Sequence, residues 1–394
     1  MTSTLPSPFE FRTATRLVVG AGTIDGLGRL ARELGCSRAL VVSDQGVVRA
    51  GCTGQGTSAL EKAGLAVRTF TGVGENPTTD HVANGVTVAR EFRPDLLVAI
   101  GGGSSMDCAK GINFVYSCGG RMNDYHGRGK ASAPMLPSIG VPTTAGTGSE
   151  TQSFALISDA ATHVKMACGD PRAAFRIAIL DVTLTLSQPP RVTALTGIDA
   201  LSHAVESHVS RAATPASRVF SREAFRLLAS GLPAVFADPA DVSARGAVQL
   251  GAAWAGMAIE NSMLGATHAL ANPLTAAHDV VHGQAVGLLL PHVVRYNAAG
   301  GDGGAEVSRR YAELLADLPG HSHLADASTA GDRLADWLAQ LVASSGLASS
   351  LRALGIDAAD LATLAAAASV QWTAGFNPRP VAIDDLARLY EEAR

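Results

Sequence analysis

The chain has 394 residues, enough for two or three domains at about 150 residues each. Hydrophobic residues make up 47% and charged residues 17%, below the roughly 25% of an average soluble domain, which excludes a disordered chain and favours a buried subunit interface. The net charge is −4 and Lys and Arg form no extended run, which excludes nucleic acid and anionic membranes as partners. We therefore expect a homodimer or higher homo-oligomer that acts on a small molecule.

The five cysteines include no C-x-x-C pair, which favours reduced thiols over a disulfide or thiolate–zinc framework. The N-terminal segment lacks a basic region followed by an apolar one, and no apolar stretch is long enough to span a membrane. These features predict a cytoplasmic protein.

In the first half, short β-branched runs alternate with helical segments. This alternation predicts an α/β domain with a mostly parallel sheet and helices on both faces. The predicted strands lie at 16–20, 38–44, 65–72 and 94–103, with further apolar runs at 135–144 and 176–182.

After the consecutive prolines Pro189 and Pro190, the chain becomes rich in Ala and Leu with apolar residues three and four apart. This pattern predicts an all-α domain. We place the α/β domain at 1–188 and the helical domain at 189–394, and we expect the Gly-rich segment 298–306 to be a loop.

A glycine-rich segment follows the apolar strand residues 96–100: Gly101, Gly102 and Gly103, then Ser104 and Ser105, then a helical stretch. Such a turn lets backbone N–H groups at a helix N-terminus approach a phosphate. We interpret it as a phosphate-binding loop; the alternative is a tight strand-to-helix turn without a ligand.

Two more segments are candidates for nucleotide contacts. Asp44 ends a predicted strand, where its carboxylate can accept hydrogen bonds from a ribose and repel a 2′-phosphate, which favours NAD over NADP. The alternative role is a helix N-cap. The segment 141–150 is rich in Thr, Ser and Gly, and it could bind a cofactor or form an exposed turn.

Six of the eleven histidines lie between residues 203 and 292. Asp199 and His203 are four apart, so on a helix they share one face and can hold a cation together. Pro273 separates His268 from His282 and is expected to break any continuous helix, which would place the two on separate elements. Three imidazoles and one carboxylate suit Fe²⁺ or Zn²⁺; ordinary core or surface histidines are the alternative.

Taken together, four motifs resemble those of the iron-containing (group III) alcohol dehydrogenase family. They lie at 101–107, 142–150, 199–206 and 263–292, in that order. The resemblance implies an N-terminal nucleotide-binding α/β domain, a helical C-terminal domain as in dehydroquinate synthase-like enzymes, and a cleft between them for NAD(P) and a divalent metal.

The resemblance also implies roles for single residues. Asp199, His203, His268 and His282 match the metal ligands, and Asp44 matches the ribose-selecting position. The residues that match the cofactor site are Gly101, Gly102, Gly103, Ser104, Ser105, Asp107, Thr143, Thr144, Thr147 and Lys165.

The sequence departs from the family pattern at a position that bears on the transfer of the proton released in alcohol oxidation. Many family members carry a second histidine four residues after the third ligand, and this chain has Asn272 there, whose amide cannot carry a proton as imidazole does. His278 is a titratable residue nearby and is our candidate catalytic residue; an ordinary loop histidine is the alternative.

These features predict a metal-dependent, NAD-linked alcohol dehydrogenase or aldehyde reductase that moves hydride between nicotinamide C4 and a small alcohol or aldehyde. The alternatives are a metal-independent reductase similar to maleylacetate reductase, a cyclising lyase similar to dehydroquinate synthase, and a non-catalytic assembly protein. The complete set of ligand-type residues argues against the first and third, and no basic, phosphate-binding substrate pocket supports the second.

Overall fold

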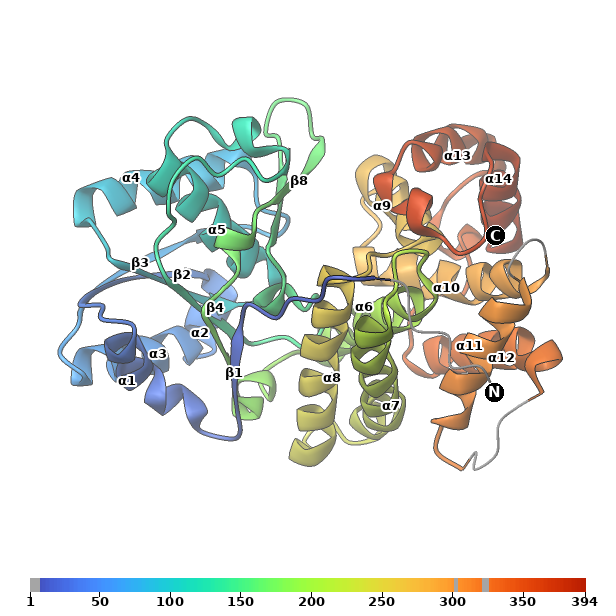
Figure 1. Cartoon of the computed structure of the whole chain (residues 1–394), viewed down its shortest axis with the longest axis horizontal. Helices are drawn as coiled ribbons and strands as arrows, with labels where there is room; N and C mark the ends of the chain where they lie inside the picture. The colour runs from blue at the N-terminus through green and yellow to red at the C-terminus, as the bar shows by residue number, and fades with distance from the viewer. Residues whose placement is uncertain (1–7, 301–303, 321–325) are drawn as a thin grey trace. The chain divides into compact units, whose positions relative to one another are not determined.

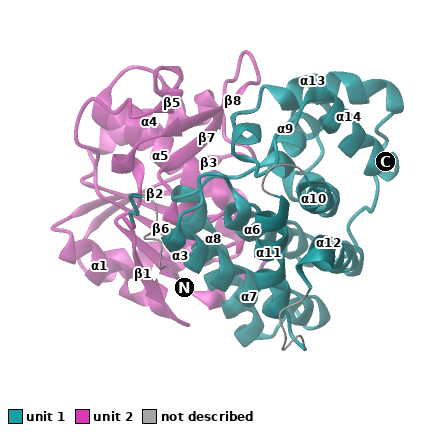
Figure 2. Cartoon of the chain, turned by 45° about the vertical axis from the view of Figure 1, so that its right-hand side comes forward, with its two compact units in different colours: residues 1–12, 189–394 teal, residues 13–188 magenta. Residues whose placement is uncertain are grey.

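The computed structural model describes residues 8–300, 304–320 and 326–394. The chain divides into two compact units (Figure 2). The α/β unit comprises Thr13–Gln188, and the helical unit comprises Pro189–Arg394 with the described part of residues 1–12. The division falls between Gln188 and Pro189, and the described residues before Thr13 group with the helical unit.

The α/β unit contains a six-stranded sheet in the order β1-β9-β6-β4-β2-β3, and every neighbouring pair is parallel. This confirms the predicted parallel sheet. The strands are β1 (Arg16–Val19), β2 (Arg38–Asp44), β3 (Ala66–Val73), β4 (Leu96–Gly101), β6 (Ser138–Pro142) and β9 (Ile177–Leu180).

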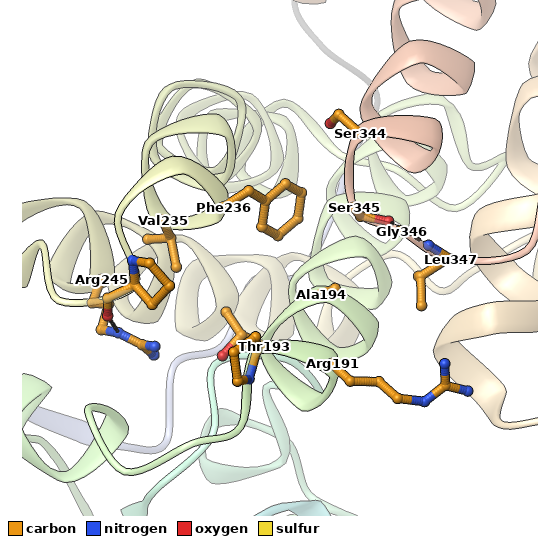
Figure 3. Close-up of a pocket in the computed structure, with 12 residues that line it drawn as sticks. Arg191, Thr193, Ala194, Val235, Phe236, Arg245, Ser344, Ser345, Gly346 and Leu347 are labelled. Atoms are coloured by element: carbon orange, nitrogen blue, oxygen red, sulfur yellow. Dashed lines mark hydrogen bonds between the residues drawn. The ribbon is translucent and has the colours of Figure 1, made fainter.

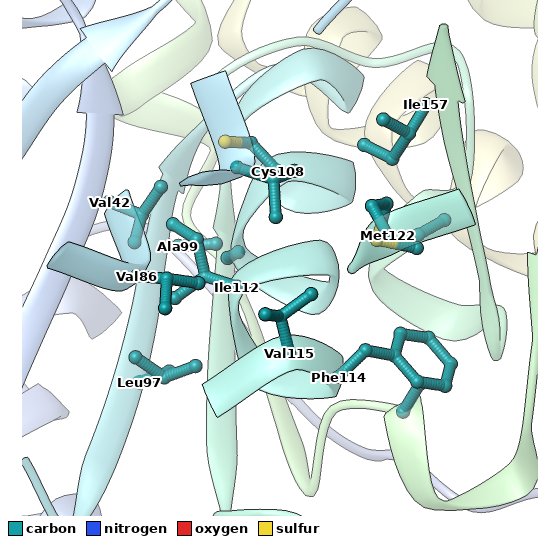
Figure 4. Close-up of a cluster of buried hydrophobic side chains, with 14 of the residues drawn as sticks. Val42, Val86, Leu97, Ala99, Cys108, Ile112, Phe114, Val115, Met122 and Ile157 are labelled. Carbon is teal, nitrogen blue, oxygen red and sulfur yellow. The ribbon is translucent and has the colours of Figure 1, made fainter. Parts of the chain in front are cut away.

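Helices pack on both faces of this sheet, with α1 and α3 on one side and α4 and α5 on the other (Figure 1). In β2, Ala39 and Val41 join the core under α1 and α3, while Leu40 and Val42 join the core under α4 and α5 (Figure 4). Burial on both faces explains why an inner strand such as β4 is continuously apolar. The helices are α1 (Leu27–Glu33), α2 (Gln45–Arg49), α3 (Cys52–Lys62), α4 (Thr79–Phe92) and α5 (Gly103–Cys118).

A second, three-stranded sheet in the order β5-β8-β7 was not predicted. Its strands are β5 (Gly127–Arg128), β7 (Phe154–Ser158) and β8 (Lys165–Gly169). Only β7 and β8 pair over several residues, and they lack the long β-branched runs by which the main strands are recognised.

The described part of the helical unit contains no strand, as predicted. Its cores are formed by Ala, Leu and Val from facing helices. The helices are α6 (Pro190–Val209), α7 (Pro215–Ala237), α8 (Val242–Glu260), α9 (Ala266–His278), α10 (His282–Ala298), α11 (Gly304–Ala316), α12 (Ala327–Ser344), α13 (Leu361–Ser369) and α14 (Ile383–Glu392).

The structure corrects the prediction that Pro273 breaks a helix: Pro273 lies inside α9, which continues to His278. The C-cap residue after the helix is Asp279, whose φ of 54° is left-handed. His268 and His282 nevertheless lie on separate elements. The predicted loop at 298–306 includes residues 301–303, which lie outside the described residues, and its last residues belong to α11.

All five cysteines are free thiols, as predicted. Burial raises the pKa of the Cys108 and Cys168 thiols to about 12, so neither is a reactive thiolate. Among the residues that the structure describes, no helix combines the length and apolar character needed to cross a membrane.

Candidate active site

Three helices of the helical unit bring the predicted metal ligands together. Asp199 and His203 lie one turn apart on α6, His268 lies near the start of α9, and His282 begins α10. Asp199, His203 and His268 are each 5% exposed or less. The short connection from Asp279 to Val281 returns the chain from α9 to α10 and thereby places His282 beside His268.

The three histidine side chains converge on one atom of the fourth residue, Asp199 Oδ1. The Nε2 atoms of His203, His268 and His282 lie 3.3, 3.6 and 3.7 Å from it, respectively. His203 Nε2 and His268 Nε2 are 3.1 Å apart, and one ligand atom from each of Asp199, His268 and His282 lies within 4.8 Å of the other two. The structure therefore brings together all four residues that the resemblance assigned.

Burial opposes ionisation of Asp199, but the three surrounding imidazoles outweigh it and hold the pKa of this carboxyl well below its usual range. Burial likewise opposes charge on His268, but Asp199 and Glu206 outweigh it and raise the imidazole pKa to about 9. Asp199 Oδ1 is buried and has no hydrogen bond of normal geometry to any described residue. A divalent cation would satisfy this atom, so the donor set fits a metal.

Glu206 is a residue of this site to which we assigned no role from the sequence. It is 4% exposed, its Oε2 lies 2.6 Å from His268 Nδ1, and its Oε1 accepts a hydrogen bond from the Thr267 backbone N–H at 2.7 Å. The sequence feature that could have identified Glu206 is its spacing, because it follows His203 by three residues and so shares its helix face.

In the α/β unit, the glycine segment forms the turn from β4 into α5, as predicted. Gly102 is the N-cap of α5 and offers no side chain to the helix end. A Cβ at Gly101, where φ is 154°, would lie 2.4 Å from Ser105 Oγ, and one at Gly103 would lie 2.7 Å from Thr147 Cγ2. Glycine is required here because side chains already crowd the turn, while the first N–H groups of α5 keep their donors for a ligand.

Asp44 combines the N-cap role with a place beside the glycine turn. Its Oδ1 accepts hydrogen bonds from the N–H groups of Gly46 and Val47 at 2.8 and 3.0 Å, so the N-cap interpretation is confirmed. Its Oδ2 accepts a hydrogen bond from Ser105 Oγ at 3.2 Å. The structure thus links Asp44 to the predicted phosphate loop, and its ribose-selecting role stays a prediction.

The Thr-rich segment lies against the glycine turn rather than in an exposed loop. The Thr143 N–H donates to the Gly101 carbonyl at 3.0 Å, and Thr144 and Thr147 border Gly102 and Gly103. Thr143 is buried, and Thr144 and Thr147 are half-buried.

Asp107 and Lys110 occupy the interior behind the turn. Asp107 accepts hydrogen bonds from Ser149 Oγ at 2.6 Å and from the Leu156 N–H at 3.2 Å. Lys110 Nζ donates to Ser149 O, Ser149 Oγ and Phe154 O at 2.7, 2.8 and 2.7 Å. Asp107 therefore supports the loop from within, whereas Lys165, also predicted to line the cofactor, is exposed at the start of β8.

His278 is the last residue of α9, and its Nε2 lies 3.9 Å from Asp360 Oδ2. At about 1.5 Å per helical residue, its backbone is roughly 15 Å from that of His268. Asn272 Nδ2 donates to Gln371 Oε1 at 3.0 Å, so its amide is engaged in a local pair. The catalytic role of His278 stays a prediction.

A cavity of about 220 Å³ opens elsewhere in the helical unit (Figure 3). The start of α6, the end of α7, Arg245 of α8 and the residues 344–347 line it, and these include none of the predicted site residues. Its position gives it no part in the chemistry of the histidine cluster.

Comparison with known proteins agrees with this geometry. Residues 14–182 match the family model "Iron-containing alcohol dehydrogenase", and residues 193–394 match the model of the C-terminal domain of Fe-containing alcohol dehydrogenases. The chain is 34% identical over 376 residues to NAD-dependent methanol dehydrogenase of Bacillus methanolicus, covering 95% of this chain and 97% of that protein. It is 32% identical over 387 residues to 1,3-propanediol dehydrogenase of Citrobacter freundii, with 98% of both chains covered.

Solved structures show the same fold. A 1,3-propanediol oxidoreductase superposes with a TM-score of 0.94 at 31% identity, covering 98% of this chain and 100% of that one. Sulfoacetaldehyde reductase from Bifidobacterium kashiwanohense, solved in complex with NAD⁺, superposes with a TM-score of 0.87 at 27% identity, covering 98% and 99%.

Proposed function

Because the chain belongs to the iron-containing alcohol dehydrogenase family, and is thus an oxidoreductase, we propose that it is a metal-dependent, NAD-linked alcohol dehydrogenase or aldehyde reductase. Its reaction is hydride transfer between nicotinamide C4 and a small alcohol or aldehyde. The names of its relatives support the substrate class, since they include methanol, 1,3-propanediol and lactaldehyde enzymes.

The observation that carries the metal-dependent part is the convergence of three imidazole Nε2 atoms on Asp199 Oδ1. Asp199, His203, His268 and His282 would hold Fe²⁺ or Zn²⁺, because nitrogen and oxygen donors suit both ions. When bound, such an ion polarises an alcohol or carbonyl oxygen and lowers the alcohol pKa. The protein fixes the positions of the donors, and the buried surroundings of Asp199 keep water from screening its charge.

The α/β unit would bind NAD through the turn from Gly101 to Ser105. Its unpaired backbone donors at the start of α5 suit a pyrophosphate, and Thr143, Thr144 and Thr147 border the same turn. Asp44, beside Ser105, would repel the extra phosphate of NADP and favour NAD.

The proton released in alcohol oxidation needs a carrier. Asn272 cannot titrate, and we propose His278 or a chain of water molecules for this task. A location in the cytoplasm and assembly into a homodimer or a higher homo-oligomer complete the proposal.

Elemental analysis together with NADH oxidation tests this function. We expect about one Fe²⁺ or Zn²⁺ per chain, NADH consumption with small aldehydes, and loss of this activity after the metal is stripped with a chelator. A metal-independent reductase would keep its activity after stripping. A non-catalytic assembly protein would oxidise no NADH with any aldehyde.

A further inference from the structure

Next to the histidine cluster lies a buried carboxylate that is not one of the predicted metal ligands. Glu206 is on α6, on the helix face that carries Asp199 and His203, and it is 4% exposed. Burying a carboxylate is costly unless its oxygens are bound, so its two contacts indicate what it does.

The first contact is with His268, whose two ring nitrogens face different groups. Nδ1 lies 2.6 Å from Glu206 Oε2, whereas Nε2 lies 3.1 Å from His203 Nε2 and 3.6 Å from Asp199 Oδ1. A proton on Nδ1, donated to Glu206, leaves the Nε2 lone pair directed at the ligand cluster. In metal sites, this arrangement of carboxylate, imidazole and ion orients the ring and makes it a stronger donor.

The second contact fixes the start of α9. The N-cap Gly265 offers no side chain, and the N–H groups of Ala266 and Thr267 donate instead to Asn377 Oδ1 at 3.1 Å and to Glu206 Oε1 at 2.7 Å. A Cβ at Gly265 would lie 2.9 Å from Asn377 Oδ1 and 3.0 Å from Glu206 Oε1. One carboxylate therefore holds both the imidazole of His268 and the backbone from which it extends.

We propose that Glu206 is a positioning residue of the metal centre, which holds the His268 ring with Nε2 toward the ion and thereby strengthens divalent-cation binding. The proposal rests on the proposed metal-dependent function. A role limited to capping α9 would stabilise the fold and leave the imidazole donor unchanged, so the two roles differ in what happens to metal affinity.

The test is the Zn²⁺ affinity of the metal-stripped full chain, measured by competition with a chromogenic chelator. Glu206→Gln keeps an oxygen that can accept from the Thr267 N–H, but it removes the charge from the His268 contact. We expect a roughly 10–100-fold weaker Zn²⁺ affinity. With Co²⁺ as the probe, the visible absorption bands should change in position or intensity, because the orientation and basicity of one ligand change.

Glu313→Gln is the matched control. Glu313 Oε2 lies 3.3 Å from Nε2 of His208, a second buried histidine of α6 that is not a predicted ligand. This variant removes a carboxylate from beside a buried histidine of α6, the helix that carries Glu206. We expect its Zn²⁺ affinity to stay within about twofold of the wild type. Should Glu206→Gln fail to fold, Glu206→Asp serves instead. It keeps the charge, but its shorter side chain places the carboxylate farther from His268 Nδ1, so the Zn²⁺ affinity of this variant should be weakened.

The outcomes separate the two proposals. A wild-type chain that binds no Zn²⁺ contradicts the metal-dependent function and, with it, the role of Glu206. Stoichiometric wild-type binding with unchanged affinity and an unchanged Co²⁺ spectrum in Glu206→Gln overturns the positioning role alone. Equal weakening in Glu206→Gln and Glu313→Gln overturns it as well, because the loss would then be general.

Discussion

A buried charged residue lies behind each of the two candidate sites, Lys110 in the α/β unit and Glu206 in the helical unit, and the two residues support different groups. Lys110 lies two turns after Gly103 on α5, and Glu206 lies two turns after Asp199 on α6. Lys110 binds main-chain oxygens of Ser149 and Phe154, whereas Glu206 binds the imidazole of His268 in addition to the Thr267 backbone N–H.

This difference follows from what each site offers a ligand. The glycine turn presents backbone donors, so its support must hold a loop in place. The metal cluster presents side chains, so its support must orient a ring. Substitutions in the α/β unit should therefore change cofactor affinity and stability, and substitutions in the histidine cluster should change metal affinity.

The largest effect on stability is expected from Lys110→Met. The substitution leaves Asp107 buried without its nearby cation and removes the donor from the carbonyls of Ser149 and Phe154. Leaving buried acceptors and a buried carboxylate without the nearby cation costs about 3–5 kcal/mol in the free energy of unfolding. Urea denaturation measures this loss, and the double variant Lys110→Met/Asp107→Asn should recover part of it. Equal stability of wild type and Lys110→Met would show that the contacts of Lys110 contribute nothing to the free energy of unfolding.

Glu150 gives the α/β unit a pH-dependent stability. It is 4% exposed, and burial raises the pKa of its carboxyl from 4.5 to about 7. The unfolded chain loses this proton at a lower pH than the folded chain, so the stability contributed below pH 4.5 is lost as the pH rises through about 7. The loss is at most roughly 3–4 kcal/mol in the free energy of unfolding.

The comparison is the urea midpoint at pH 5 and at pH 8. We expect Glu150→Gln to remove a fall in stability that the wild type shows between these values. Glu61→Gln, at an exposed position, is the control and should behave as the wild type does. A wild-type midpoint that rises with pH, and that Glu150→Gln does not alter, would contradict the assignment.

A smaller effect, on rate, is expected from His278→Gln. If His278 carries the proton, kcat/KM at saturating cofactor should fall at least about tenfold and lose an ionisation between about pH 6 and 8. The pH profile of kcat/KM measures both. An unchanged profile would leave water as the carrier.

Asp44→Gly should produce the smallest effect. Two charges about 4 Å apart interact by about 1 kcal/mol in bulk water, so removing the half-buried carboxylate should narrow the preference for NADH over NADPH by about tenfold. Values of kcat/KM for the two cofactors measure the change. A wild-type preference for NADPH would show that Asp44 does not select the ribose.

The parallel sheet and the helical second half could be predicted because their signals are local. Strands buried on both faces, such as β2 and β4, are continuously apolar, and the helices keep a regular apolar spacing. Pro273 misled the prediction because a proline inside a helix costs only one hydrogen bond and a local clash, which tertiary packing around α9 can offset. The short sheet of β5, β7 and β8 has no comparable local signal.

The ligands could be predicted from motifs, but their support could not. The histidine cluster and the four-residue spacing of Asp199 and His203 indicated candidates, and the resemblance assigned these two residues, His268 and His282 as the ligands. The contact of Glu206 with His268 joins residues 62 positions apart, and that of Lys110 with Ser149 joins residues 39 apart. Only the folded chain brings such pairs together.

The central claim is that the histidine cluster holds a metal needed for hydride transfer, and His268→Ala tests it most directly. Metal content by elemental analysis, NADH binding by fluorescence, and NADH oxidation with a small aldehyde should be measured on the same preparation. We predict that the variant loses its metal and its hydride transfer but still binds NADH, because the predicted cofactor site lies in the α/β unit. Full activity in His268→Ala would contradict the claim.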